Sequence, residues 1–246
     1  MISGLYSAAT SMDAAVRRHE MAAENLANIQ MPGYRRRVMS QATFDPSIPS
    51  GDSAASGPHS SMPTGAASSP IEFDFSQGRL EETERPLDLA ISGDGFFTVQ
   101  GNDGPLYTRN GSFHVGPDRE LTTIDKLPVL SGGRPIELPN GANSESIEIT
   151  SDGRMYSNGQ EFARLDVVQF SNTSVLTPVG ASLFTAPADT IPQPSPAEVL
   201  QGRLEFANTS PINEMISIIT GMRNYEASQK ALNTISESVQ RRIGLR

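Results

Sequence analysis

Apolar residues near the start of the chain recur at a helical spacing. One seven-residue register holds through residues 5–29, and its members are Leu5, Met12, His19 and Leu26, with Ala8, Ala15, Ala22 and Ile29 three residues on. The repeat predicts a narrow apolar seam along one face of a helix. Small side chains bury little area, so we expect this helix to be marginally stable alone. Pro32 and Gly33 predict that it ends near Gln30.

A second helical pattern occupies the other end of the chain. Pro211 suits the first helical position and Gly244 suits the end. The apolar residues between them are Ile212, Met215, Ile219, Met222, Tyr225, Leu232, Ile235 and Val239. Two helices with apolar seams that are so distant in sequence can pair within one chain only if the middle of the chain brings the second helix back to the first. Otherwise their seams need partner subunits.

The middle of the chain has a different texture, with short apolar runs separated by turn dipeptides. The dipeptides are Asp94-Gly95, Asp103-Gly104, Asn110-Gly111, Asn140-Gly141, Asp152-Gly153 and Asn158-Gly159. Such pairs supply the positive φ that tight hairpins require, so the sequence predicts an antiparallel β body. Within it, the prolines of segment 187–196 predict a loop in which regular strand pairing fails.

These patterns together predict a mixed, mainly β fold in which an antiparallel β body is flanked by N- and C-terminal α-helices. The expected boundaries are 1–34 for the first helix, 35–70 for a loop or linker, 71–206 for the β body and 207–246 for the second helix. Residues 45–70 are dominated by Ser, Pro, Gly and Ala, with too few large apolar side chains to offset the entropy of ordering.

Composition excludes several classes of function. The 246 residues contain no cysteine, so the chain has no disulfide, thiolate metal site or cysteine nucleophile. The net charge of −9 lacks the basic surface that neutralises phosphates, so we expect no nucleic-acid partner. No cleavable secretory signal is visible. No segment has the roughly 20 consecutive apolar residues of a membrane span, so we expect no membrane insertion.

Candidate chemistry is sparse. The histidines His19, His59 and His114 are dispersed along the chain, so we predict no metal site. A carboxylate pair for acid–base catalysis could come from Asp88, Asp94 and Asp103, but these acids lie in turn sequences, and we predict neither catalytic residues nor a cofactor. Two alternatives remain, a β module that binds a cell-wall polymer and is oligomerised by its helices, and an enzyme acting on cell-wall glycan.

Four stretches of sequence point to a known family. The first is the element Asn25, Leu26, Ala27, Asn28, Gly33 and Tyr34, where the first helix ends. Residues 85–99, 107–115 and 199–238 supply the others, and in the last of these Gln201, Glu205 and Asn208 match at the family's spacing. With these motifs the chain resembles the flagellar axial family of rod and hook proteins, and its form of residues 85–91 is more similar to the proximal rod type than to the distal type. It departs from the family pattern at Gln30 and Met31.

The resemblance implies a structural subunit of the bacterial flagellar basal-body rod, and no enzyme. It implies a subunit exported unprocessed by the flagellum-specific type III apparatus and polymerised into a torque-transmitting shaft that crosses the periplasm. Its partners would be copies of itself, other rod or hook-family subunits and the export apparatus. In this family the terminal helices pack together as an inner tube, so the resemblance implies that they pair as a coiled-coil-like stalk.

Three groups of residues follow as candidates. The expected assembly interface consists of Leu5, Met12, Leu26, Ile29, Met215, Ile219, Met222, Tyr225, Leu232, Ile235 and Val239. Phe44 and Ile48 resemble the export signal of early flagellar substrates. A further hypothesis is that surface arginines at the two ends align subunits against the acidic body, and these are Arg17, Arg18, Arg35, Arg36, Arg37, Arg241 and Arg242.

Overall fold

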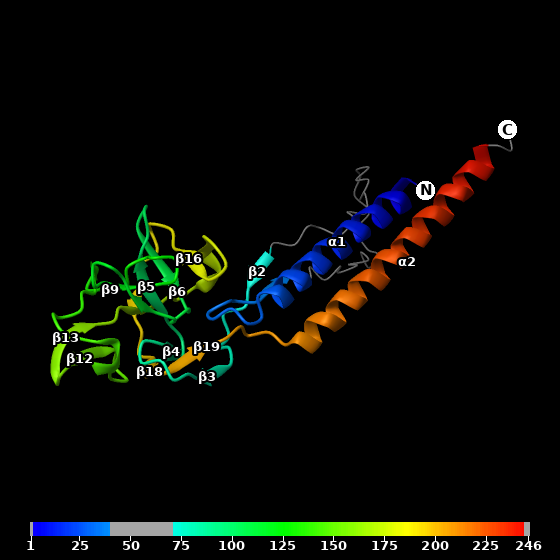
Figure 1. Cartoon of the computed structure of the whole chain (residues 1–246). Helices are drawn as coiled ribbons and strands as arrows, with labels where there is room; N and C mark the ends of the chain where they lie inside the picture. The colour runs from blue at the N-terminus through cyan, green and yellow to red at the C-terminus, as the bar shows by residue number, and fades with distance from the viewer. Residues whose placement is uncertain (1, 40–70, 244–246) are drawn as a thin grey trace, which may run out of the picture. The chain divides into compact units, whose positions relative to one another are not determined.

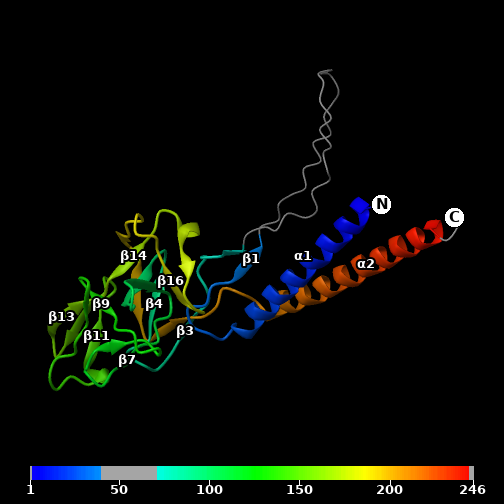
Figure 2. The same cartoon turned by 90° about the horizontal axis from the view of Figure 1, so that it is seen from above.

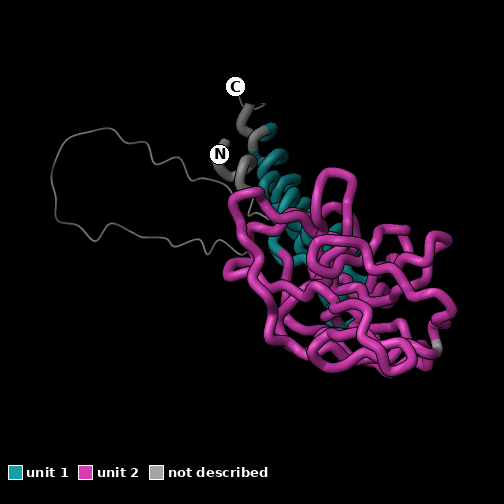
Figure 3. The backbone as a smooth tube through the Cα atoms, turned by 90° about the vertical axis from the view of Figure 1, so that its left-hand side faces the viewer, with its two compact units in different colours: residues 1–26, 37–72, 210–246 teal, residues 27–36, 73–209 magenta. Residues whose placement is uncertain are grey.

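The computed structural model describes the backbone of residues 2–39 and 71–243. The chain divides into two compact units (Figure 3). Residues 1–26, 37–72 and 210–246 form the first, which we call the helical unit. Residues 27–36 and 73–209 form the second, which we call the β unit. Phe44 and Ile48, the candidate export signal, lie outside the described residues.

The helical unit contains two long helices that lie side by side (Figures 1 and 2). Helix α1 spans Ile2–Ala27 and helix α2 spans Pro211–Ile243. The expected end of the first helix near Gln30 is therefore three residues too late. A turn replaces the last part, in which the N–H of Met31 donates to the carbonyl of Asn28 at 3.0 Å. Strand β1 (Arg37–Met39) pairs with β2 (Ile71–Phe73), whose last residue begins the β unit.

The β unit is built from short strands. A six-stranded sheet has the order β15 (Thr177–Pro178), β16 (Leu183–Thr185), β6 (Pro105–Thr108), β5 (Phe96–Gln100), β14 (Val167–Gln169) and β17 (Gln193–Pro194). A three-stranded sheet contains β11 (Ile147–Ile149), β12 (Arg154–Ser157) and β13 (Gln160–Arg164).

Four two-stranded sheets complete it. They are β4 (Leu89–Ser92) with β18 (Glu198–Gln201), β3 (Leu80–Glu82) with β19 (Arg203–Glu205), β7 (His114–Val115) with β8 (Leu121–Thr122), and β9 (Leu130–Ser131) with β10 (Arg134–Pro135). Short 3₁₀ turns occur at Ser144–Ser146 and Thr173–Val175. The strand pairs are antiparallel, which confirms a mainly β fold with antiparallel sheets and two helices.

Turn chemistry explains where prediction from dipeptides works. Asn158 and Gly159 have φ values of 53° and 77° and connect β12 to β13, with Ser157 opposite Gln160. The prediction that strand pairing fails throughout 187–196 is wrong, because Pro194 pairs with Val168 in β17. Strand β17 is the outermost strand of its sheet, where a missing N–H donor is tolerated.

Two apolar clusters hold the β unit together. The larger gathers aliphatic side chains around Phe97, Phe113 and Met155. The smaller is aromatic, with Phe96, Tyr107, Phe170 and Phe184 each less than a tenth exposed. Edge-to-face packing joins these rings, and the centroids of Tyr107 and Phe170 lie 4.8 Å apart. The β unit therefore has its own core, independent of the helices.

Candidate assembly surface

Helix α2 carries a row of exposed apolar side chains along its first three turns. Its members, with their exposed fractions, are Ile212 69%, Met215 52%, Ile216 56%, Ile219 52% and Met222 52%. Spacings of three and four residues place side chains on one side of a helix, so these five form one continuous surface, the α2 ridge. Single exposed apolar residues are ordinary, whereas a contiguous row of them is typical of interaction surfaces, which makes the α2 ridge the candidate assembly surface.

The opposite face of α2 packs on α1. Its residues are buried or half-buried and follow one another at alternating spacings of four and three, and they are Glu214, Ile218, Gly221, Tyr225, Ser228, Leu232 and Ile235. Gly221 lies at this contact, where a Cβ would be 3.6 Å from Cβ of His19 and 3.7 Å from the carbonyl oxygen of Ala15. On α1 the facing side chains of Ala15 and Ala22 are buried.

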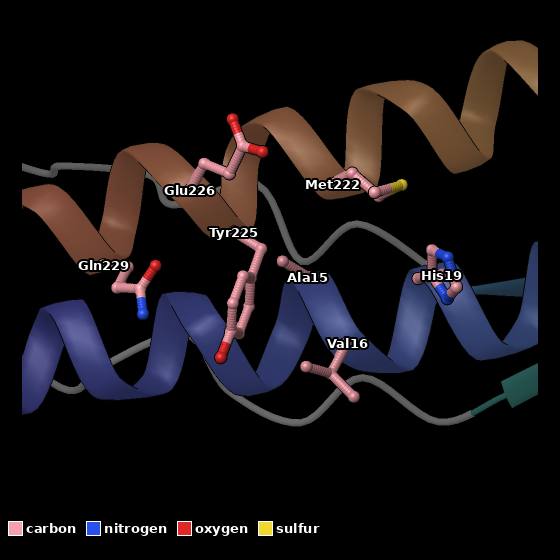
Figure 4. A pocket seen from close by; sticks show the side chains of 8 residues that line it. Ala15, Val16, His19, Met222, Tyr225, Glu226 and Gln229 are labelled. Carbon is pink, nitrogen blue, oxygen red and sulfur yellow. The ribbon is translucent and has the colours of Figure 1, made fainter.

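A groove of about 390 Å³ opens between the two helices beside this contact. Figure 4 shows its lining, in which the ring of Tyr225 extends from α2 toward α1 near Ala15 and Val16. His19, Gly221, Met222, Glu226 and Gln229 complete it. Met222 belongs both to the groove and to the α2 ridge, so apolar surface continues from one to the other.

The structure divides the predicted interface residues between these two faces. Met215, Ile219 and Met222 are more than half exposed on the ridge, whereas Tyr225, Leu232 and Ile235 are half-buried on the face toward α1. The N-terminal members Met12, Leu26 and Ile29 are also half-buried. Leu5 and Val239 lie in α1 and α2, and their side chains fall outside the described part of the structure. Sequence periodicity missed Ile216, which completes the ridge.

The residues of the family motif serve the turn that follows α1. Asn25 is buried, and its amide pairs with the backbone of Arg37 in both directions, with Oδ1 accepting from the N–H at 2.9 Å and Nδ2 donating to the carbonyl at 3.0 Å. Leu26 and Asn28 are half-buried and Ala27 is exposed. Asn25 thus holds β1 against the end of α1, a role that requires an amide side chain.

Gly33 and Tyr34 lie inside the β unit. Gly33 has a φ of 72°, and a Cβ there would lie 2.2 Å from the backbone nitrogen of Asn110. Only glycine fits both the conformation and the space. Tyr34 is almost fully buried. The motif is therefore the place where the chain leaving α1 enters the core of the β unit.

A buried ionic cluster, which the sequence did not reveal, lies next to this entry point. The carboxylate of Glu205 pairs with Arg35 at 2.7 Å through Oε1 and with Arg109 at 3.1 Å through Oε2, and all three side chains are buried. The Arg109 guanidinium also lies over the ring of Phe96, 5.4 Å from its centroid. Burial lowers the pKa of Arg109, and the charge of Glu205 opposes this shift.

This cluster corrects the hypothesis that Arg35 belongs to a set of surface arginines. The side chain of Arg35 is fully buried against Glu205, so it cannot face another subunit. Arg37 pairs within the chain, at 2.7 Å from Glu24. The run of three arginines gave no sign of this, because nothing in one sequence shows which positive charge has a buried partner far away.

The candidates for chemistry that the structure describes do not assemble into a site, and His59 lies outside the described residues. The described residues hold no group of three or more His, Cys, Asp or Glu side chains placed to bind a metal ion. Asp88 is buried, with Arg85 at 3.5 Å. No helix in the described part of the chain is long and apolar enough to cross a membrane.

Comparison with known proteins gives consistent matches. Residues 90–157 match the family model of the flagellar hook protein FlgE/F/G D1 domain, and residues 200–244 match that of the flagellar basal body rod FlgEFG protein C-terminal region. The flagellar basal-body rod protein FlgG of Agrobacterium fabrum is 32% identical over 94% of each chain. FlgG of Bacillus subtilis is 29% identical over both full lengths. The flagellar basal-body rod protein FlgF of Caulobacter vibrioides is 33% identical over 72% of this chain and 77% of its own.

Proposed function

We propose, from the premise that this chain belongs to the family of flagellar basal-body rod proteins, that it is a structural subunit of the rod in the bacterial flagellar basal body. Its relatives carry that description in their names, and the match with the relative from Agrobacterium fabrum extends over 94% of both chains. Members of this family are structural components of the rod, so no enzymatic reaction is assigned to this chain. Other copies of this chain and other rod or hook subunits are its partners.

The observation that carries assembly is the α2 ridge. Five apolar side chains in one row are at least half exposed. Contact between apolar surface and water is unfavourable, so burying this row against another subunit lowers the free energy. Burying one such side chain fully contributes about 1.5–3 kcal/mol, so a repeated contact through this row stabilises a polymer even when each interface is small. A surface that meets a different surface on the next subunit produces an open helical array, as a shaft requires, when the rotation between subunits does not close into a ring.

We further propose that α1 and α2 form a coiled-coil-like stalk. Alternating spacings of four and three residues on the inner face of α2 are the spacings of a heptad seam. Alanine and glycine at the contact permit a close approach but bury little area. The pair is therefore stabilised further when neighbouring subunits cover the groove and the ridge.

The remaining parts of the proposal rest on the resemblance. The subunit is exported unprocessed by the flagellar type III apparatus, with Phe44 and Ile48 as the candidate signal, and it becomes part of a torque-transmitting shaft across the periplasm. The domain limits 1–34, 35–70, 71–206 and 207–246 stay predictions. The preference for the proximal part of the rod also stays a prediction, because the names FlgG and FlgF state no position.

A charged substitution on the ridge tests assembly. Ile219→Glu introduces a carboxylate at a position that is half exposed in the monomer. We therefore expect the monomer to fold normally. In the polymer the charge would be buried without a partner, at a cost of several kcal/mol. We expect rod incorporation, measured on purified basal bodies, to fall at least about tenfold.

The matched control is Asn224→Glu, which adds the same charge at an exposed polar position of α2. Normal incorporation of Asn224→Glu together with loss for Ile219→Glu supports the ridge as an interface. Normal incorporation of both variants would remove the ridge from the assembly surface.

The cell-wall-binding alternative is not favoured. Such a module would stack sugar rings on exposed aromatic faces, but Phe96, Tyr107, Phe170 and Phe184 are buried in the second core cluster. The comparisons likewise match rod and hook proteins.

A further inference from the structure

Segments distant in the sequence converge on one carboxylate in the β unit. Glu205 accepts from Arg35, from Arg109 and from the backbone N–H of Gly78, the last at 2.7 Å. Its own backbone carbonyl accepts from the N–H of Gly33 at 2.7 Å. Glu205 therefore holds the segment that follows α1 with both its side chain and its main chain.

A second set of hydrogen bonds continues this connection. Asn208 Oδ1 accepts from the N–H of Arg36 at 2.8 Å, and Asn208 Nδ2 donates to the carbonyl of Asp74 at 2.7 Å. The N–H of Asp74 in turn donates to the carbonyl of Arg36 at 2.9 Å. Residues 33–36 come just after α1 and residues 205–208 come just before α2. The two segments that lead to the helices are thus joined, inside the β unit, by directional bonds.

Stability alone does not account for a buried ionic cluster at this place. Two guanidinium groups share one carboxylate, and Nε and Nη1 of Arg35 and Nε of Arg109 have no hydrogen-bond partner in the described structure. Well-packed apolar side chains often stabilise a protein as much as a buried ionic cluster does or more. Charged hydrogen bonds are directional, whereas apolar contacts are not. They therefore restrict the relative placement of the groups that they join.

We propose that Arg35, Glu205 and Arg109 form a positioning site for assembly, which sets the register between the segment that follows α1 and the segment that precedes α2. The inference rests on the proposed function as a rod subunit. Apolar residues at these positions would fill the same space and leave the register to the backbone bond of Gly33 and the bonds of Asn208 alone, so the two segments would slide more readily. The ionic cluster prevents sliding, so each subunit offers its helices to its neighbours in one arrangement.

The test separates stability from register. In the triple variant Arg35→Met, Glu205→Leu, Arg109→Met the cluster is apolar, and we expect a Tm within about 5 °C of the parent protein. We expect amide exchange of residues 33–36 and 205–208 to accelerate at least about tenfold, while exchange in β5 and β6 changes less than about twofold. Rod incorporation should be lost. Unchanged exchange in both segments with normal incorporation would overturn the proposal.

A second variant covers the case in which the triple variant does not fold. Arg35→Lys keeps the charge and loses the planar fork that pairs with a carboxylate. We expect it to fold with faster exchange in residues 33–36 and reduced incorporation, and parent-like exchange would overturn the proposal. The control is Glu82→Gln, which removes the exposed pair with Arg203 and should change neither property.

The two readouts keep this proposal distinct from the proposed function. Amide exchange is measured on the purified subunit and needs no rod. If the parent protein failed to incorporate into a rod, the proposed function would fail. A loss of register in the exchange data would still show what the ionic cluster holds in place.

Discussion

At the scale of single residues, the motif around the end of α1 is decided by space and hydrogen bonding. Asn25 supplies an acceptor and a donor to one backbone position, Arg37, which neither aspartate nor leucine could do. Gly33 stands against the backbone of residues 109–110 with a positive φ. Such positions are specific because two independent constraints meet at one side chain.

Gly33→Ala should therefore be among the most damaging small substitutions in the β unit. The new Cβ meets backbone atoms at 2.2 Å and 2.6 Å, and these atoms cannot rotate away as a side chain would. We expect the free energy of unfolding, measured by urea denaturation with circular dichroism, to fall by about 3 kcal/mol or more.

Gly132→Ala is the matched control. Gly132 also has a positive φ, 56°, but a Cβ there meets nothing within 4 Å. Only the backbone preference is lost, which costs about 1–2 kcal/mol. Equal losses for the two variants would show that the contact with residues 109–110 contributes nothing.

At the scale of elements, α2 has two apolar faces that differ in their burial. One face packs on α1 through Gly221 and Tyr225, and the other is the α2 ridge. The interface residues that the periodic pattern predicted lie on both faces of α2. This happens because a helix with many apolar residues has more than one apolar face. Burial distinguishes them.

Gly221→Ala tests how closely the helices approach. A Cβ at this position lies at ordinary contact distance from His19 and Ala15, so alanine fits. Glycine inside a helix is less favourable than alanine by about 0.5–1 kcal/mol. We expect Gly221→Ala to raise the thermal midpoint of the helical circular-dichroism signal.

Gly221→Leu gives the contrast, because its side chain extends beyond the Cβ position, which already lies at contact distance from His19 and Ala15. We expect that variant to lower the same midpoint. A lower midpoint for Gly221→Ala would mean that the helices lie closer together than the structure shows.

At the scale of the whole molecule, assembly depends on which surfaces remain for partners after the chain has used its own. The arginines near the ends are largely engaged within the chain, Arg35 with Glu205, Arg17 with Asp13 and Arg241 with Glu237. The α2 ridge, by contrast, is an uncovered row of apolar side chains. Subunits should therefore associate through apolar contact more than through charge.

The salt dependence of polymerisation follows from this. Raising the salt from about 0.1 M to 1 M shortens the Debye length from about 10 Å to 3 Å and screens exposed charges, while apolar burial persists. We expect the critical concentration for polymerisation, measured by sedimentation, to change less than about threefold. A tenfold or larger rise in the critical concentration would show that charge alignment, and not apolar contact, is the main contribution to polymerisation.

The sequence by itself determined the elements and the family. Periodic apolar residues located both helices, and dipeptides such as Asn158-Gly159 located hairpins, because these signals act between residues close in the chain. Motifs such as residues 25–28 identified the family. The end of α1 and the pairing of Pro194 were missed, since both depend on contacts made elsewhere in the fold.

Only the tertiary structure decided which predicted residues share a surface and which charges are buried. Arg35, Arg109 and Glu205 are separated by 74 to 170 positions in the sequence, and no local pattern relates them. The same holds for the division of α2, where Ile219 is exposed and Tyr225 faces α1. Local propensity is a property of neighbours in the chain, whereas burial and ion pairing depend on segments that meet only after the chain has folded.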